Sequence, residues 1–269
     1  MLNTGMNMAM TSSYDMLLVV LSIVVAIVAS YTALNLAGRV TAAQGGSRTV
    51  WLLGGATAMG IGIWSMHFIG MLAFSLPVPI SYDIGITIFS MIAAIIASAI
   101  ALFIVSRNEM GLTQLLLGGV LMGVGIGVMH YSGMWAVRVD ATVSYDPVFF
   151  LLSVVIAVVV SVVALWLSFH LRNETGGIGL LQKGISAFVM GGAIVGLHYT
   201  AMMASNFMPT ASSATASAAS ATGMNSSSLA WGVGIATLLV LGLALISSMM
   251  SQRMSVGPVG IPKEARPAR

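Results

Sequence analysis

The chain has 269 residues, of which 58% are hydrophobic and only 6% are charged. Soluble domains carry about 25% charged residues, so this composition cannot cover a soluble surface and predicts a membrane protein with several spans. The chain has no cysteine, which excludes disulfides and thiolate ligands. Its net charge of +3 is informative only through the placement of the basic residues.

The N-terminal segment, residues 1–12, is rich in methionine and contains no Lys or Arg. Without a basic region it does not resemble a cleaved signal peptide, so we expect the first apolar run to remain as a span. Met6, Met8 and Met10 alternate. Alternate thioethers on an extended segment could hold a soft metal ion, whereas a start region of biased composition is the simpler explanation.

Hydropathy predicts an all-α membrane domain over residues 13–250, because backbone groups in lipid must pair within each segment. Each predicted span reaches about the 20 residues that cross a hydrocarbon core. The seven spans are 16–38, 50–74, 84–105, 114–137, 148–171, 184–205 and 229–250. The apolar runs alternate with short polar segments, which predicts seven transmembrane helices.

The distribution of Lys and Arg predicts the orientation of these helices. Nine of the ten basic residues fall in alternate segments, and Arg138 alone lies on the other side. Basic loops stay in the cytoplasm, so the N-terminus is predicted outside and the C-terminus inside. Residues 207–228 are rich in Ser, Ala and Thr and are predicted to be a disordered outer loop. Residues 251–269 are predicted to form a basic cytoplasmic tail.

The tripeptide Ser-Tyr-Asp precedes three odd-numbered spans, with its Asp at positions 15, 83 and 146. The repeating unit is therefore this tripeptide, a helix, a short basic loop and a returning helix; three units leave the seventh helix outside the repeat. Ser and Asp cap helix N-termini and Tyr anchors at the interface. The alternative is an acidic lid over a site between the helices.

Each returning helix carries a second motif, which has a His, an adjacent aromatic, a small residue at +3 and a Met at +4. Each copy also has Met-Gly at −8 and −7. The three copies run from Met66 to Met71, from Met129 to Met134 and from Leu197 to Met202. They contain three of the four histidines, His67, His130 and His198. The fourth, His170, ends the fifth span on the cytoplasmic side and is not expected in a shared site.

Positions −7, 0 and +4 share one stripe of a helix, so each Gly, His and +4 Met faces the same way. The glycine allows a neighbouring helix to approach. All three helices run outward with the His about two-thirds along, so the imidazoles lie at one depth in the outer leaflet. We therefore predict that His67, His130 and His198 converge, with Met71, Met134 and Met202 one turn further out. The alternative is that each His bonds a neighbouring helix as packing glue.

Imidazole together with thioether favours a soft ion, chiefly Cu(I). Zinc prefers His with carboxylate or Cys, and no predicted span contains Asp or Glu. Haem is the rival cofactor, because His and Met are haem ligands, but three equivalent sites suit a small ion better. The sequence shows no catalytic triad, nucleotide loop or zinc-protease motif, so no enzyme activity and no nucleic-acid partner are expected.

The three motifs resemble the MHYT domain, a bacterial membrane-sensor family, and the resemblance extends from Ser13 to about Met250. It implies copper held by Met and His residues that senses oxygen, carbon monoxide or nitric oxide. The residues implied are His67, Met71, His130, Met134, His198, Met202, Met66 and Met129. No copy reads Met-His-Tyr-Thr literally: the first has Phe68-Ile69, the second Ser132 and the third Leu197.

We therefore expect a multi-pass protein of a bacterial inner membrane that senses a diatomic gas or redox state through copper. Because 19 residues follow the last span, the signal is expected to pass to a separate cytoplasmic protein. The alternatives are a protein that binds, delivers or transports copper, and a structural membrane scaffold with packed histidines.

Overall fold

The fold is described from a computed structural model that covers residues 10–174, 176–209 and 223–255. Within these residues, seven helices are long and apolar enough to cross a membrane. They are α1 (Met16–Ala42), α2 (Gly45–Ala73), α3 (Ile84–Val105), α4 (Leu112–Trp135), α5 (Pro147–Leu171), α6 (Gly177–Met203) and α8 (Ser226–Ser255). The predicted membrane protein with seven helical spans is confirmed.

Helices α2 and α6 begin earlier than hydropathy predicts, at Gly45 and Gly177. An apolar window measures only the part of a helix that crosses hydrocarbon. The helix itself continues for as long as its backbone hydrogen bonds do, and here it extends through glycine-containing and polar residues. Boundaries read from hydropathy are therefore too short at these ends.

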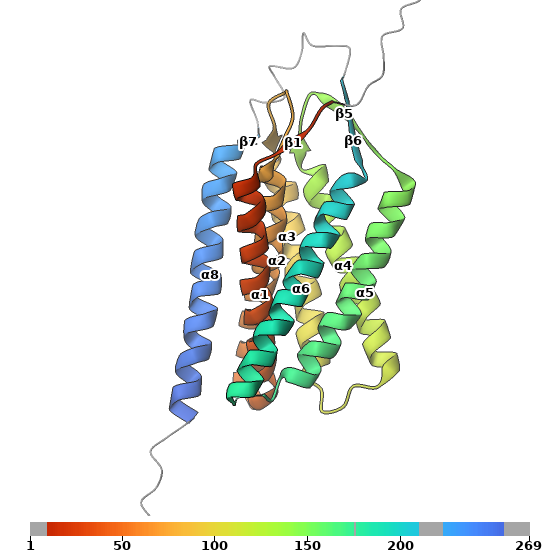
Figure 1. Cartoon of the computed structure of the whole chain (residues 1–269). Coiled ribbons are helices and arrows are strands. Elements are labelled where there is room, and N and C mark those ends of the chain that lie inside the picture. Colours follow the sequence, from red (N-terminus) through yellow and green to blue (C-terminus); the bar gives the residue numbers. More distant parts are fainter. Residues whose placement is uncertain (1–9, 175, 210–222, 256–269) are drawn as a thin grey trace, which may run out of the picture.

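Six of the helices form a closed ring. Each helix from α1 to α6 packs on the next, and α6 packs back on α1. Helix α8 lies outside the ring against α1 and α2 (Figure 1). The two-helix repeats are thus arranged around a common axis, with the extra helix on one side.

Short strands gather at the end of the bundle where α1, α3, α5 and α8 begin, and this end is called the strand end (Figure 1). The antiparallel pairs are β1 (Ser13–Tyr14) with β2 (Phe74–Ser75), β3 (Ser81–Tyr82) with β4 (Val137–Arg138) and β7 (Met224–Asn225), and β5 (Ala141–Tyr145) with β6 (Ser205–Pro209). In each repeat, the Ser-Tyr strand pairs with the residues that follow the returning helix. Each two-helix unit is therefore closed on itself.

The aspartates of the three tripeptides cap the outgoing helices. Asp15 accepts hydrogen bonds from Leu17 and Leu18, Asp83 from Ile86, and Asp146 from Val148 and Phe149. The backbone N–H of each Asp donates to the end of the returning helix, at the carbonyls of Ala73, Ala136 and Ala204, over 2.8, 2.8 and 2.7 Å. The capping interpretation is therefore supported, since these carboxylates serve the helix N-termini.

The predicted loop 207–228 differs from the structure at both edges. Residues up to Pro209 extend strand β6, and Met224 and Asn225 form β7 before α8 begins at Ser226. Backbone pairing with β5 and β3 orders these edges, a long-range effect that local composition does not contain. Residues 210–222 lie outside the described part of the chain.

At the opposite end, here called the loop end, a basic residue organises the connections. The Arg172 guanidinium donates to the backbone carbonyls of Val105, Arg107 and Asn108 and lies 3.9 Å from the centre of the Phe169 ring. A planar guanidinium with five donors is suited to serving several carbonyls at once. This residue therefore joins α5 to the connection between α3 and α4.

Candidate metal centre

Three histidines meet on the axis of the ring, close to the strand end. His67, His130 and His198 lie within the last two turns of α2, α4 and α6, and they are 0%, 5% and 2% exposed. Because the three helices run in the same direction and end at the same level, equal positions along them place the rings at one depth. The predicted convergence of the imidazoles is confirmed.

The rings approach each other through their Nδ1 atoms. His67 Nδ1 lies 3.1 Å from His130 Nδ1 and 3.2 Å from His198 Nδ1. The ring centres are 4.7, 5.1 and 5.4 Å apart. Each ring can place a nitrogen within 4.8 Å of a nitrogen of both others. The three side chains therefore form one cluster and not three separate sites.

The small residue at +3 of each motif makes this convergence possible. A Cβ on Gly133 would lie 2.3 Å from His67 Nε2, and one on Gly70 would lie 2.4 Å from His198 Nε2. In the third repeat Ala201 lines a small cavity together with His130. Each imidazole therefore lies against the +3 residue of the next motif helix around the axis.

The glycines at −7 bring the helices of adjacent repeats together. A Cβ at each would lie within 3 Å of backbone atoms on the neighbouring outgoing helix. The pairs are Gly60 with Ile95, Gly123 with Val158, and Gly191 with Ile27. The three contacted residues are themselves at equivalent repeat positions. The structure confirms the close approach that the glycine stripe predicts.

The histidine cluster has more hydrogen-bonding capacity than its protein partners use. Among the described residues, the Nε2 atoms of all three rings are buried without a hydrogen-bond partner. The Nδ1 atom of a neutral imidazole is either a donor or an acceptor, so His67 Nδ1 cannot fully serve both of its neighbours. Three rings packed only for stability would leave an Nδ1 contact unsatisfied at a cost, whereas an ion at Nδ1 would use all three Nδ1 lone pairs and leave the Nε2 atoms as they are.

A single metal ion fits this arrangement. Nitrogen ligands bind Zn²⁺ at about 2.0–2.1 Å, and at such a length three ligands of one ion lie about 3.3–3.5 Å apart. The two Nδ1 separations from His67, 3.1 and 3.2 Å, differ from that by a few tenths of an ångström, and all three rings offer nitrogens within 4.8 Å of one another. Neutral imidazole suits zinc, copper, iron and nickel. The three Nδ1 lone pairs can thus serve as three ligands of one ion.

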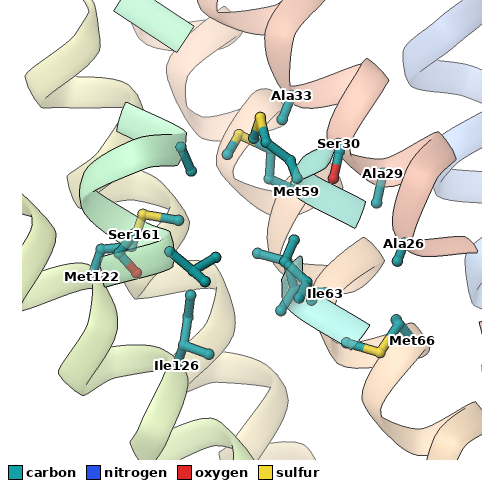
Figure 2. A pocket seen from close by; sticks show the side chains of 14 residues that line it. Ala26, Ala29, Ser30, Ala33, Met59, Ile63, Met66, Met122, Ile126 and Ser161 are labelled. Atoms are coloured by element: carbon teal, nitrogen blue, oxygen red, sulfur yellow. The ribbon is translucent and has the colours of Figure 1, made fainter. Parts of the chain in front are cut away.

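The five predicted methionines are all buried around this cluster. Met66, Met71, Met129, Met134 and Met202 are each 3% exposed or less. Met66 also lines an apolar cavity together with Ile63 and Ile126, which stand one helical turn before His67 and His130 (Figure 2). The methionines are placed in the same core as the imidazoles, and thioether ligation stays a prediction.

Aromatic contacts join the strand end to the three helices that carry the histidines. The Tyr of each Ser-Tyr-Asp tripeptide contacts the aromatic residue next to a motif His, with ring centres 5.6 to 6.1 Å apart. The pairs are Tyr14 with Tyr199, Tyr82 with Phe68, and Tyr145 with Tyr131. Burial raises the pKa of Tyr14, Tyr82 and Tyr145. These tyrosines therefore stay neutral, and each links a strand to the helix that carries a motif His.

A set of buried serines also supports the site, and sequence reasoning missed it. Tyr131 Oη lies 2.6 Å from Ser153 Oγ, and Tyr199 Oη lies 3.4 Å from Ser22 Oγ. The first motif has Phe68, which has no hydroxyl, and there Trp64 Nε1 donates to Ser90 Oγ over 3.1 Å. The three serines each follow a capping Asp by seven residues, and this spacing was the available signal.

The remaining predicted positions fall outside the cluster. His170 is exposed at the loop end of α5, apart from the three histidines, and its Nδ1 lies 2.8 Å from the Trp166 carbonyl oxygen. Met10 is partly buried against the core, and its N–H donates to the Phe207 carbonyl. Met6 and Met8 lie outside the described residues.

A comparison with known families matches this architecture. The model of the MHYT family, described as a "Bacterial signalling protein N terminal repeat", matches residues 3–50, 60–118 and 123–179, which together exceed half of the chain. No solved structure matches the chain.

Three curated bacterial proteins are similar in sequence. The chain is 49% identical over 243 residues to the bifunctional diguanylate cyclase/cyclic di-GMP phosphodiesterase MucR of Pseudomonas aeruginosa, covering 90% of this chain and 35% of that protein. It is 39% identical over 196 residues to the signaling protein YkoW of Bacillus subtilis (72% and 24%), and 38% identical over 192 residues to the cyclic di-GMP phosphodiesterase NbdA of P. aeruginosa (71% and 24%). The chain thus spans between about a quarter and a third of each relative. With three matched repeats and seven membrane-spanning helices, the chain belongs to the MHYT family of bacterial membrane signalling proteins.

Proposed function

We propose that the chain is a non-enzymatic membrane sensor whose His67, His130 and His198 hold one copper ion through their Nδ1 atoms. The observation that carries this proposal is the meeting of three buried Nδ1 atoms, two pairs of which are 3.1 and 3.2 Å apart. Membership of a signalling family supports a sensor role. A copper ion in such a site would supply a soft centre that binds a diatomic gas or changes its redox state.

The chemistry of the surroundings favours copper over zinc and haem. The nearby methionines are soft donors, and the described bundle axis brings no carboxylate to the three histidines. Haem needs a wide pocket, whereas the three imidazoles are in contact with one another. We propose Met71, Met134, Met202, Met66 and Met129 as the pool from which a further thioether ligand is drawn.

Three nitrogen ligands leave a fourth position, and a weakly held thioether there would give way to an exogenous ligand. Burial of the histidines keeps bulk water from competing for that position. A small neutral molecule that dissolves in lipid can reach it through the membrane. We therefore propose oxygen, carbon monoxide or nitric oxide as the sensed ligand, with oxidation of the centre as the related redox signal.

The output is proposed to lie at the loop end. Nine of the ten basic residues fall in the segments that the hydropathy pattern assigns to the loop-end side of the membrane. This distribution supports an inner-membrane protein with the N-terminus outside. Relatives named as cyclic di-GMP enzymes support cyclic di-GMP turnover as the class of output. A ligand-induced shift of α2, α4 and α6 would be passed to a cytoplasmic signalling protein through their loop-end termini.

Metal analysis of the purified full chain and of single histidine variants tests the proposal. Wild-type protein is expected to hold one copper ion, and His67→Ala, His130→Ala and His198→Ala should each lose most of it. His170→Ala is the matched control and should retain all of it. Loss of about a third in each variant would indicate separate sites, contrary to the shared centre. Unchanged copper in all three would leave the packed-histidine scaffold as the explanation.

Gas binding separates a sensor from a copper-handling protein. Copper-loaded protein exposed to carbon monoxide should show one C–O stretching band in the infrared, and the band should be absent from His130→Ala. A copper handler would bind metal without this band, and its deletion would change cellular copper content.

A further inference from the structure

A cavity lies on the axis of the ring, next to the histidine cluster on its loop-end side. Helices α2, α4 and α6 line it at equivalent positions, with the Ile that stands four residues before each His and the Met that stands eight residues before it. Helix rise places these layers about 6 and 12 Å from the imidazoles. Figure 2 shows Ile63, Ile126, Met59 and Met122 around this space. The cavity therefore follows the threefold repeat, as the histidine cluster does.

The cavity is small and almost entirely apolar. It offers about 30 Å³ of space for the centre of a water-sized molecule. By this measure a water needs about 10–15 Å³, so the cavity accommodates a molecule of about two heavy atoms. Its lining contains no charged residue. These walls therefore favour a small, neutral and apolar occupant.

Two polar groups lie in the wall. Ser30 and Ser161 line the cavity and are 3% and 0% exposed, and neither hydroxyl has a hydrogen-bond partner among the described residues. Figure 2 shows both side chains at this space. Other buried serines of the same helices, such as Ser22 and Ser153, bond to a backbone carbonyl. The unpartnered hydroxyls are thus available to a weak acceptor inside the cavity.

We infer that this cavity is a docking chamber for a neutral diatomic gas, which it supplies to the histidine centre. The inference rests on the proposed function and adds a second gas site to it. Apolar walls and polarisable thioethers favour a gas molecule over water, which needs two to four polar partners. Ile63, Ile126 and Ile194 line the cavity one helical turn before His67, His130 and His198, so the cavity lies about 6 Å along the helices from the imidazoles.

Xenon binding to metal-free protein tests the chamber without any copper. Xenon enters small dry apolar cavities, and its saturable uptake is measured by ¹²⁹Xe NMR on protein in nanodiscs. Wild type should show one saturable site. Ala26→Leu, which adds a branched side chain to the wall, should abolish it, and Ala230→Leu on the exposed face of α8 is the control. Met122→Ala enlarges the cavity and should strengthen xenon uptake. If Ala26→Leu does not fold, unchanged uptake in Met122→Ala would contradict the chamber.

The outcomes for the chamber and for the copper centre are distinguishable. Absence of a saturable xenon site, or its survival in a folded Ala26→Leu variant, would overturn the chamber even if copper binds. Appearance of the site only in Ser30→Ala or Ser161→Ala would also overturn it, because a bound water would then be the native occupant. Xenon uptake in a protein that binds no copper would instead retain the chamber and refute the proposed centre. In copper-loaded protein, Ala26→Leu should keep its copper and slow the arrival of carbon monoxide.

Discussion

The substitution Gly133→Ala provides a sharp test of how the imidazoles are seated. The new Cβ would lie 2.3 Å from His67 Nε2, whereas ordinary contact begins at 3.4 Å. The His67 ring would have to move by about 1 Å, since α4 is held by its neighbours on both sides. Metal–ligand distances tolerate only about 0.2 Å, so this displacement should disrupt the proposed three-nitrogen site.

The expected loss of Cu(I) affinity is about 10- to 100-fold, the range seen when groups that orient metal ligands are removed. It is measured by competition with a chromophoric Cu(I) chelator. Overpacking costs about 1–3 kcal/mol, and replacing glycine by alanine in a helix returns about 1 kcal/mol. The variant should therefore fold, with a small net decrease in the free energy of unfolding.

Gly192→Ala is the matched control, because a Cβ there meets nothing within 4 Å. It makes the same chemical change on another motif helix and should keep wild-type affinity. A folded Gly133→Ala protein with unchanged copper affinity would refute the seating of His67 on Gly133. Equal losses in both variants would show that helix conformation, and not contact with the ring, controls binding.

Three further predictions concern orientation, capping and the hydroxyl contacts. In intact cells, an impermeant thiol reagent should label Thr142→Cys at the strand end and not Asn108→Cys at the loop end; the reverse pattern would invert the topology. Asp146→Ala should lower the free energy of unfolding by about 0.5–2 kcal/mol, and Asp146→Asn by less, because Asn also caps; equal losses would contradict the capping role. Tyr131→Phe should lower the free energy of unfolding in detergent by about 0.5–1.5 kcal/mol, more than Tyr199→Phe, whose hydroxyl contact is longer. Equal losses in the two variants would show that the Tyr131–Ser153 contact does not stabilise the fold.

The sequence alone determined the helices, the repeat and the depth of the histidines. Lipid leaves a backbone no partner outside its own helix, so a long apolar run has one stable conformation. Within that conformation, fixed periodicity assigns His67, His130 and His198 to matching faces at matching depth. The capping role of the aspartates also followed from local chemistry, because a cap involves only residues next to it in the chain.

The tertiary structure decided which groups meet across helices. The order of helices around the ring sets each imidazole against the +3 residue of the next motif helix, and this contact joins residues more than 60 positions apart. The same packing brings the Nδ1 atoms together and leaves the cavity next to the histidines. It also places Ser90 where it accepts a hydrogen bond from Trp64, in the repeat whose motif has Phe68 and therefore no hydroxyl. Helical periodicity fixes the direction of a side chain relative to its own helix only, so the neighbour it faces depends on how the helices pack.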